Sequence, residues 1–260
     1  MSLLKRRFRE ELHPLLTWGI TLFLTSLALM LFGRLIYDIQ LTEGLDQILG
    51  KMPPMVRNMF GGGPIQGAPY LYIIGMAFDT LAPILLLVYT SLTVLGFYTR
   101  EAGQGNLEFL FSLPIKRSKL IAQRILVFFS YLAMLQVLFA LGVILGAQMT
   151  GLKIDYNALT WAVVDLYLLF VCIGGLAFLL SLTTNDYSRG MLLVLGILLG
   201  LFVLNIGVGD VKSVLAYLNP FHYYDAAAIL RELTVPSLEM CGFALTGLAF
   251  WGAGIGLYIR

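Results

Sequence analysis

The sequence predicts an all-α integral membrane protein with six transmembrane helices. Of its 260 residues, 59% are hydrophobic and only 12% are charged, whereas a soluble chain has about 25% charged residues. Runs of roughly 20 apolar residues, long enough to cross the hydrocarbon core as helices, recur along the chain. Each run should be helical, because lipid offers no partner for backbone N–H and C=O groups. We expect residues 1–260 to form one membrane domain without an internal repeat.

Six runs have the required length. The first is too long for the apolar part of a cleaved signal peptide, and no A-x-A site follows it. The second and third exceed the minimum, so these helices should tilt or extend beyond the membrane. We expect the spans at about 15–36, 70–98, 120–149, 158–182, 190–208 and 238–259.

The basic residues predict the orientation of the chain. With the N-terminus inside, eleven of the 17 Lys and Arg residues fall on the cytoplasmic side and six on the outer side. This bias places both termini in the cytoplasm. Residues 1–14 then predict a helix on the inner membrane face, where arginines meet anionic headgroups; the alternative is a frayed charged tail. The net charge of +2 is too small to indicate a nucleic-acid partner.

A compact polar stretch, R-E-A-G-Q-G-N-L-E-F-L-F-S-L-P-I-K-R-S-K, separates the second and third runs at Arg100–Lys119. Asn106 can cap a helix start, and Glu108 favours the positive end of the helix dipole. Three apolar residues share one helix face at i, i+3 and i+4 spacing, namely Leu107, Leu110 and Phe111. Pro114 ends the helix. The pattern predicts a short amphipathic helix at about 106–113, parallel to the membrane; an inert interfacial loop helix is the alternative.

The same stretch resembles the R-E-x-x-x-G-T-L-E-x-L-x-x-L-P-I-S-R pattern of type 2 ABC exporter permeases. In that family the pattern joins the second and third of six spans and docks into the ATP-binding subunit as the coupling helix. Asn106 stands in place of the family's common Thr, and Lys116 in place of its Ser. The resemblance implies an ATPase-coupling role for Arg100, Glu101, Gly105, Asn106, Leu107, Glu108, Leu110, Phe111, Pro114 and Arg117.

The resemblance also implies the partners of this chain. Two six-span subunits, either two copies of this chain or this chain with a similar permease, would meet around a central route. Two copies of an ABC ATP-binding subunit would attach on the cytoplasmic side. The location would be the cytoplasmic (inner) membrane of a prokaryote, with the lipid bilayer as the surrounding partner.

The chain itself is expected to catalyse no reaction and to bind no cofactor or metal. A phosphate-binding loop needs G-x-x-x-x-G-K-[ST]. The nearest approach, Gly44–Met52, has five residues between its glycines and Met52 where Ser or Thr is required. We therefore expect ATP and Mg to be bound by the separate ATPase chain.

The connection Gly209–Ser237, before the last run, predicts outer re-entrant helices. Two apolar segments, each able to form a short helix, are separated by Asn219-Pro220. The stretch N-P-F-H-Y-Y-D resembles the family's aromatic outer segment, which implies an outer gate at Asn219, Pro220, Phe221 and Tyr223. The alternative is a packed outer cap. Without rows of basic residues, the predicted route suits amphipathic or hydrophobic cargo: peptide toxins, antimicrobial peptides, lipids or drugs, with peptide export our narrower hypothesis.

Two carboxylates lie inside predicted spans, where an ionised group costs roughly 2.5–3.5 kcal/mol. Asp79 and Asp165 should therefore face a cavity or a partner. They can line a translocation route or bind a cation, as in an ion-coupled transporter or channel. Alternatively, they pair with Arg34 or a Tyr hydroxyl and hold helices in register.

An intramembrane aspartyl protease is the more distant alternative. G-V-G-D at Gly207–Asp210 spells the GxGD pattern of such enzymes, in which paired carboxylates share a proton. However, Asp38 and Asp210 lie at the outer ends of predicted spans, and no P-A-L sequence follows.

Overall fold

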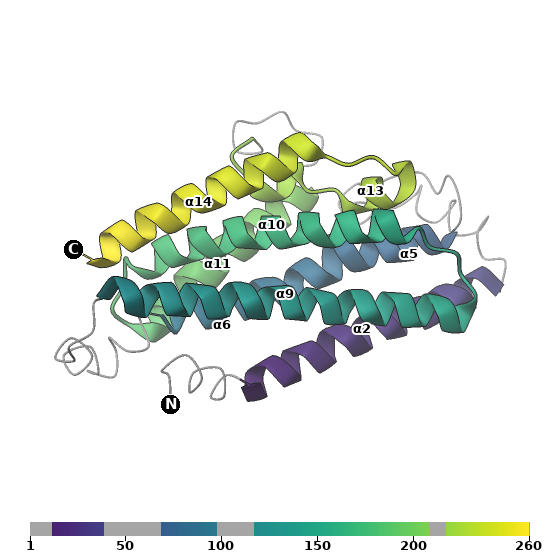
Figure 1. The fold of residues 1–260 in the computed structure, drawn as a ribbon, viewed down its shortest axis with the longest axis horizontal. Coiled ribbons are helices and arrows are strands. Elements are labelled where there is room, and N and C mark those ends of the chain that lie inside the picture. Colours follow the sequence, from purple (N-terminus) through teal and green to yellow (C-terminus); the bar gives the residue numbers. More distant parts are fainter. Residues whose placement is uncertain (1–11, 39–68, 98–116, 208–216, 260) are drawn as a thin grey trace.

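The fold is known from a computed structural model that describes residues 12–38, 69–97, 117–207 and 217–259. The regular secondary structure of these residues is entirely helical, and the remaining described residues lie in turns and short connections (Figure 1). The helices are α2 Leu12–Asp38, α5 Pro69–Met76, the π-helix η1 Ala77–Leu81, α6 Ala82–Leu95, α9 Arg117–Thr150, α10 Tyr156–Ser181, α11 Tyr187–Gly207, the 3₁₀-helix η2 Pro220–Tyr223, α13 Ala226–Glu232 and α14 Ser237–Ile259.

Among the residues that the structure describes, six helices are long and apolar enough to cross a membrane, in agreement with the predicted number of spans. Their candidate spans are Pro14–Arg34, Ile73–Leu95, Ser118–Thr150, Tyr156–Ser181, Tyr187–Gly207 and Ser237–Ile259, each within a few residues of the range expected from the sequence. Successive long helices run in alternating directions along the long axis (Figure 1). The first residues of α2 and the last residues of α14 therefore lie toward the same end of the bundle.

Two glycines on α9 explain how closely it packs against α2. A Cβ added to Gly142 would lie 2.6 Å from the carbonyl oxygen of Phe23, and one added to Gly146 would lie 2.4 Å from the Cβ of Met30. Such small residues let helix backbones approach each other in membranes. Arg34, near the end of α2, donates a hydrogen bond to the carbonyl of Thr150 and so joins the far ends of the same two helices.

Helix α10 lies at the centre of the bundle and contacts α6, α9, α11, α13 and α14. Its start is capped by Asp155, whose side chain accepts hydrogen bonds from the backbone N–H groups of Asn157 and Ala158 at 2.8 and 3.1 Å. Toward its other end, aromatic rings fill the space between α10 and α14: Phe178 stacks on Trp251 with 5.4 Å between ring centroids. Trp251 also donates its ring N–H to the carbonyl of Val171 at 2.9 Å.

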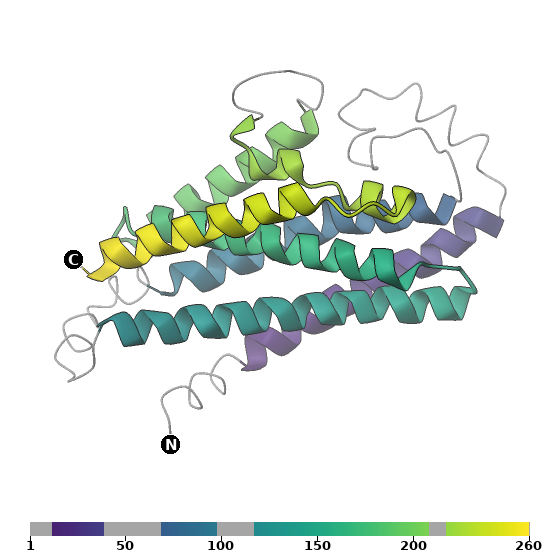
Figure 2. The same ribbon diagram turned by 45° about the horizontal axis from the view of Figure 1, so that its top comes forward.

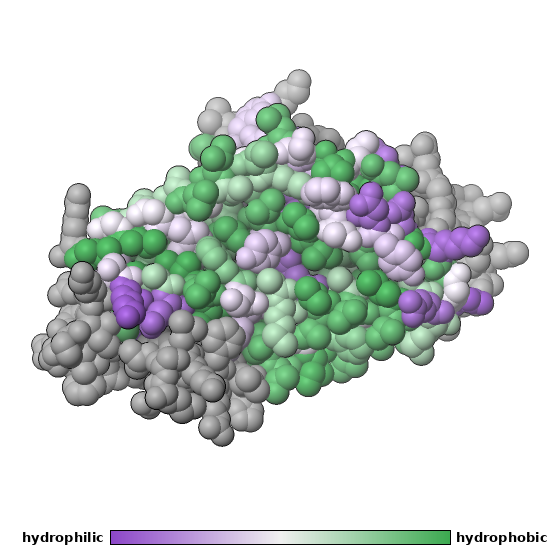
Figure 3. Space-filling model, in the orientation of Figure 1, coloured by the Kyte–Doolittle hydropathy of each residue, from purple (hydrophilic) through white to green (hydrophobic). Residues whose placement is uncertain are grey.

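The surface of the bundle is strongly apolar. In the view of Figure 3, hydrophobic residues cover the middle of the molecule, whereas hydrophilic residues gather mainly toward the two ends of the long axis. Leucines project from α11 and α14 with large exposed fractions, for example 77% for Leu192 and 69% for Leu245. This distribution is the one expected of a multi-pass membrane protein, whose lateral surface is covered by lipid or by another membrane chain.

The second span is helical, as predicted, but it is not one continuous α-helix, because the π-helix η1 interrupts it between α5 and α6. The cause is Pro83, which has no N–H and whose ring would clash with the carbonyl four residues earlier in an α-helix. The backbone widens by one residue, so that the N–H of Ala82 bonds the carbonyl of Ala77, five residues back. Pro83 in mid-span was the sequence signal for this interruption.

Candidate functional site

The connection between α11 and α14 carries η2 and α13, and we call residues 217–236 the η2–α13 segment. Helix α13 contacts α5, η1 and α10, and Figures 1 and 2 both show it beside the end of the bundle where α5 begins. The segment thus lies against the helices that carry Asp79 and Asp165. Asn219 immediately precedes η2, whereas most of the short helix predicted before Asn219-Pro220 lies outside the described residues.

Asn219 fixes the start of η2 against α11. Its side-chain N–H donates to the carbonyl of Leu201 at 2.7 Å, and its side-chain oxygen accepts from the backbone N–H of Phe221 at 3.1 Å. Phe221 is buried and packs edge-on against Phe202 of α11, with ring centroids 5.2 Å apart. Asn219 and Phe221, two of the predicted gate residues, therefore hold the η2–α13 segment in place.

Tyr223, another predicted gate residue, is exposed. Its hydroxyl donates to the carbonyl of Tyr217 at 3.0 Å. His222 lies between these two tyrosines and meets both rings edge-on, with centroid distances of 5.8 Å to Tyr217 and 5.3 Å to Tyr223. These contacts leave two tyrosine rings in defined positions on the surface beside Pro220.

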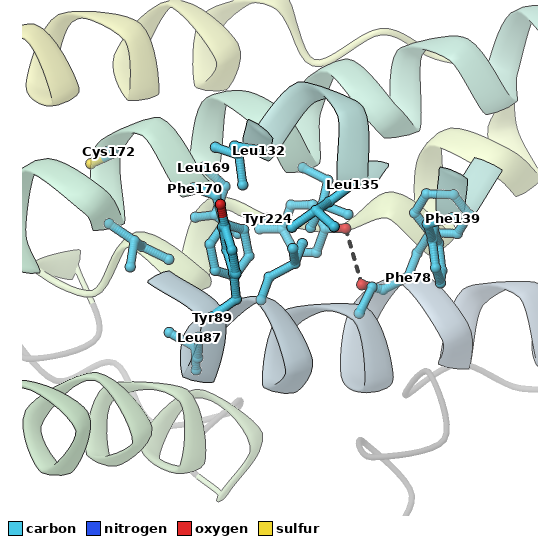
Figure 4. Packing of buried hydrophobic residues seen from close by; sticks show 14 of the residues in the cluster. Phe78, Leu87, Tyr89, Leu132, Leu135, Phe139, Leu169, Phe170, Cys172 and Tyr224 are labelled. Carbon is cyan, nitrogen blue, oxygen red and sulfur yellow. Dashed lines mark hydrogen bonds between the residues drawn. The ribbon is translucent and has the colours of Figure 1, made fainter. Parts of the chain in front are cut away.

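The π-helix leaves one backbone carbonyl available to the η2–α13 segment. The N–H of Ala82 bonds the carbonyl of Ala77, and Pro83 offers no N–H, so the carbonyl of Phe78 lacks the donors that would bond it in an α-helix or a π-helix. The hydroxyl of Tyr224 donates to this carbonyl at 3.1 Å, as the dashed line in Figure 4 shows.

Asp79, the next residue, makes a second bond to the segment. Its Oδ1 accepts a hydrogen bond from the backbone N–H of Ala226, the first residue of α13, at 3.0 Å. Asp225 caps the same helix by accepting from the N–H of Ala228 at 2.8 Å. We call the two bonds from the segment to Phe78 and Asp79 the Asp79–Tyr224 anchor.

Tyr224 remains a hydrogen-bond donor at any pH that the protein meets. Burial, and secondarily the carboxylates of Asp79, Asp165 and Asp225, raises the pKa of its phenol well above the usual value. The neutral phenol has one O–H group, which the carbonyl of Phe78 accepts. The anchor therefore does not depend on a titrating tyrosine.

Asp165 lies in the middle of α10 and is fully buried, with 0% of its surface exposed. Neither carboxylate oxygen has a hydrogen-bond partner among the described residues. The carboxylates of Glu239 and Asp225 are close enough to act on it electrostatically. Buried polar groups are almost always paired, so a proton, a water or a ligand is expected at this carboxylate.

A groove of about 480 Å³ opens on the side of the bundle where α10, η2 and α14 meet. Its walls are mainly apolar and include Tyr217, Pro220, Tyr223, Phe243 and Phe250. Glu239, near the start of α14, is the one charged side chain among the described residues that line it. Sequence reasoning missed both Glu239 and the groove, because the groove exists only where three distant segments meet.

The structure brings some of the predicted site residues together. Asp79 bonds the η2–α13 segment directly, and Asp165 is within electrostatic range of Asp225 in that segment. Asp79 accepts a hydrogen bond from the backbone N–H of Ala226, while Arg34 donates to the carbonyl of Thr150 and the hydroxyl of Tyr224 to that of Phe78.

Other predicted residues cannot be compared with the structure. Arg117 is the first residue of α9, but the other nine predicted coupling residues lie outside the described residues, as do residues 1–11 and Asp210. Beside the coupling stretch, Arg124 of α9 is buried and donates to the carbonyl of Phe97, which follows α6. Sequence reasoning counted Arg124 only as a cytoplasmic charge.

Within the described part of the chain, no group of three or more His, Cys, Asp or Glu residues is arranged to hold a metal ion. No protein-family model matches the chain, and no curated protein matches it significantly, so its function has to be argued from its own residues.

Proposed function

We propose that this chain is the permease subunit of an ATP-driven ABC exporter that moves amphipathic or hydrophobic substrates out of the cell. The observation that carries the proposal is the stretch Arg100–Lys119, which matches the coupling-helix pattern of type 2 ABC exporter permeases between the second and third of six apolar spans. ATP would be hydrolysed on a separate partner chain, because this sequence has no phosphate-binding loop.

The neighbourhood of that stretch supports a mechanical role. The stretch connects α6 to α9. The buried guanidinium of Arg124, in α9, donates a hydrogen bond to the carbonyl of Phe97, which follows α6. A displacement of the coupling helix by the ATPase would therefore reach two long membrane helices that are joined at their base. Helix α6 continues into η1, whose Phe78 and Asp79 hold the η2–α13 segment. This route leads from the proposed ATPase contact to the proposed outer gate.

Further parts of the proposal concern assembly and location. The exposed apolar faces of α11 and α14 are available to lipid or to a second permease chain, and a Cβ added at Gly196, Gly200, Gly252 or Gly256 would meet nothing within 4 Å. We place the chain in the inner membrane of a prokaryote, with both termini in the cytoplasm and two ATP-binding subunits below the permease pair. The cargo class that we favour is an amphipathic peptide.

The decisive experiment is to co-express the chain with candidate ABC ATP-binding subunits from its source organism and to reconstitute any purified complex in vesicles. Glu108→Arg and Gly105→Pro should leave the protein folded but separate ATP hydrolysis from transport of amphipathic peptides. Lys153→Glu, a charge reversal at an exposed residue between α9 and α10, is the control for the charge change. Full ATP-dependent transport by both variants would show that the coupling assignment is wrong.

A second candidate function is ion-coupled transport, and one observation favours it: Asp165 is fully buried and its carboxylate has no partner among the described residues. Such carboxylates mark ion or proton routes in membrane proteins. If this candidate is right, the purified chain alone should move protons or sodium into vesicles, and Asp165→Asn should stop it. ATP-dependent transport that survives Asp165→Asn would instead favour the exporter.

A further inference from the structure

The groove between α10, η2 and α14 has the dimensions and walls of a ligand site. Its volume of about 480 Å³ lies within the roughly 300–1,000 Å³ of small-molecule sites, which are mostly apolar with a few convergent polar groups. The walls combine aromatic rings, among them Phe243 and Phe250, with the side chains of Pro220 and Leu238. Leu238 is 81% exposed, so the groove opens at the side of the bundle, where an amphipathic molecule can enter from the membrane.

Among the described residues that line the groove, the one charged side chain is negative. This side chain is Glu239, and the buried Asp165 lies within electrostatic range of Glu239 and Asp225. The groups that act on Asp165 are both carboxylates. Arg231 is directed elsewhere, since its Nε donates to the carbonyl of Ala227 and its charge acts on Asp79. In a site with low-dielectric walls, the negative charge of Glu239 attracts a cation.

The polar groups of the groove do not favour an anion or a strongly hydrogen-bonding ligand. The hydroxyl of Tyr223 already donates a hydrogen bond to the carbonyl of Tyr217. The hydroxyl of Thr246 is donated to the carbonyl of Gly242 at 2.7 Å. Among the described lining residues, a ligand meets the Glu239 carboxylate, the ring and hydroxyl of Tyr217 and further aromatic surface. A cation can be stabilised by ring faces as well as by the carboxylate.

We infer that this groove binds a lipophilic cation, a molecule with aromatic or aliphatic bulk and one positive charge held near Glu239. The rings of Tyr217, Tyr223, Phe243 and Phe250 would cover the apolar bulk, and Glu239 would pair with the charge. The inference deepens the proposed exporter function by restricting amphipathic cargo to cationic amphiphiles, and to that extent rests on it. Binding itself requires only this chain.

The test compares two ions of the same shape and opposite charge, tetraphenylphosphonium and tetraphenylborate. The full-length chain is purified in nanodiscs of neutral lipid, and binding of radiolabelled ion is measured with empty nanodiscs as the blank. Saturable binding of tetraphenylphosphonium is expected, with no saturable binding of tetraphenylborate. Equal binding of the two ions, or tetraphenylphosphonium uptake no greater than that of empty nanodiscs, would overturn the inference.

A pair of matched variants then tests the role of the carboxylate. Glu239→Gln keeps the shape of the side chain and should weaken tetraphenylphosphonium binding on the order of ten-fold, because one close charge and its desolvated surroundings are lost. Glu232→Gln removes an exposed carboxylate that does not line the groove and should leave the affinity unchanged. An unchanged affinity in Glu239→Gln, or an equal loss in Glu232→Gln, would contradict the assignment.

Cysteine protection supplies a measurement that does not depend on the stability of Glu239→Gln. Gly242 lines the groove and Gly252 lies on the same helix away from it, and a Cβ at either position meets nothing within 4 Å. In a background with the exposed Cys241 replaced by Ser and the buried Cys172 of the groove wall retained, tetraphenylphosphonium should slow maleimide labelling of Gly242→Cys but not of Gly252→Cys. Equal labelling rates with and without the ion at Gly242→Cys would exclude the groove as its site.

These measurements can be separated from the test of the exporter itself. If the chain binds tetraphenylphosphonium but Glu108→Arg has no effect on ATP-dependent transport, the binding site is supported and the coupling assignment is rejected. If ATP-dependent transport responds to Glu108→Arg but the chain shows no saturable tetraphenylphosphonium binding, the exporter function is supported and the binding site is rejected.

Discussion

The Asp79–Tyr224 anchor should decide how firmly α13 is held against the second span. Tyr224→Phe removes the hydroxyl that donates to the carbonyl of Phe78 at 3.1 Å, and it changes nothing else in the shape of the ring. The carbonyl is then left without its donor, because Pro83 prevents an intrahelical replacement. A buried acceptor deprived of its partner costs about 1–3 kcal/mol.

Asp79 allows the second bond to be tested with a pair of similar side chains. Asp79→Leu removes the oxygen that accepts from the N–H of Ala226 at 3.0 Å and should cost about 1–3 kcal/mol for the orphaned donor. Asp79→Asn retains an oxygen at the same place and should retain most of the stability. Because both bonds hold the same few residues, the effects of Tyr224→Phe and Asp79→Leu should not add, with a coupling of roughly 0.5–3 kcal/mol in a double-mutant cycle.

Hydrogen exchange of the α13 amides measures this anchor directly. Loss of one or two kcal/mol raises the population of the open segment about 5- to 30-fold, so exchange at Ile229 and Leu230 should accelerate by that factor in Tyr224→Phe. Tyr223→Phe is the matched control, since the hydroxyl of Tyr223 bonds only the exposed segment around Tyr217. Exchange in Tyr224→Phe that matches the wild type, or an equal acceleration in Tyr223→Phe, would refute the reasoning.

Three further predictions concern topology and packing. Cysteines replacing Ser118 and Asn185 should resist an impermeant thiol reagent added to intact cells, whereas those replacing Gln66 and Ser213 should react; labelling of Ser118→Cys would reverse the orientation. Gly142→Ala should destabilise the detergent-purified chain by about 1–3 kcal/mol through overpacking, because its Cβ would lie 2.6 Å from the carbonyl oxygen of Phe23. Gly196→Ala, whose Cβ would meet nothing within 4 Å, should not lower the melting temperature. Arg124→Met should cost about 1.5–3 kcal/mol through loss of a charged hydrogen bond to Phe97, and a melting temperature equal to that of wild type would contradict this role.

The number of spans and their approximate ends could be predicted from the sequence because they depend on local hydropathy. An apolar run such as 158–182 needs a helix of that length whatever surrounds it, and α10, Tyr156–Ser181, matches it closely. The helical nature of Ala226–Glu232 and the break at Asn219-Pro220 were likewise predictable, since capping and proline effects act within a few residues.

The candidate site was predictable only as a set of unusual residues. Asp79 and Asp165 could be identified because charge is rare in apolar spans. The difference between their environments could not be predicted. Asp79 accepts a hydrogen bond from the first residue of α13, 147 positions away in sequence, whereas Asp165 has no hydrogen-bond partner among the described residues. The sequence pattern contains no information about which carboxylate finds a donor, because that depends on how the helices are placed side by side.

By itself, the sequence predicted six apolar helices long enough to cross a membrane, and it contains one short stretch that resembles the coupling-helix pattern. Only the tertiary structure decided that Pro83 frees a carbonyl for Tyr224, that Arg124 joins α9 to the end of α6, and that Glu239 lines an aromatic groove. The physical reason is that hydropathy, capping and proline effects act over one or two helical turns, so a single segment records them. Hydrogen bonds between helices and the shape of a groove depend instead on lateral contacts, which arise only when several segments pack together.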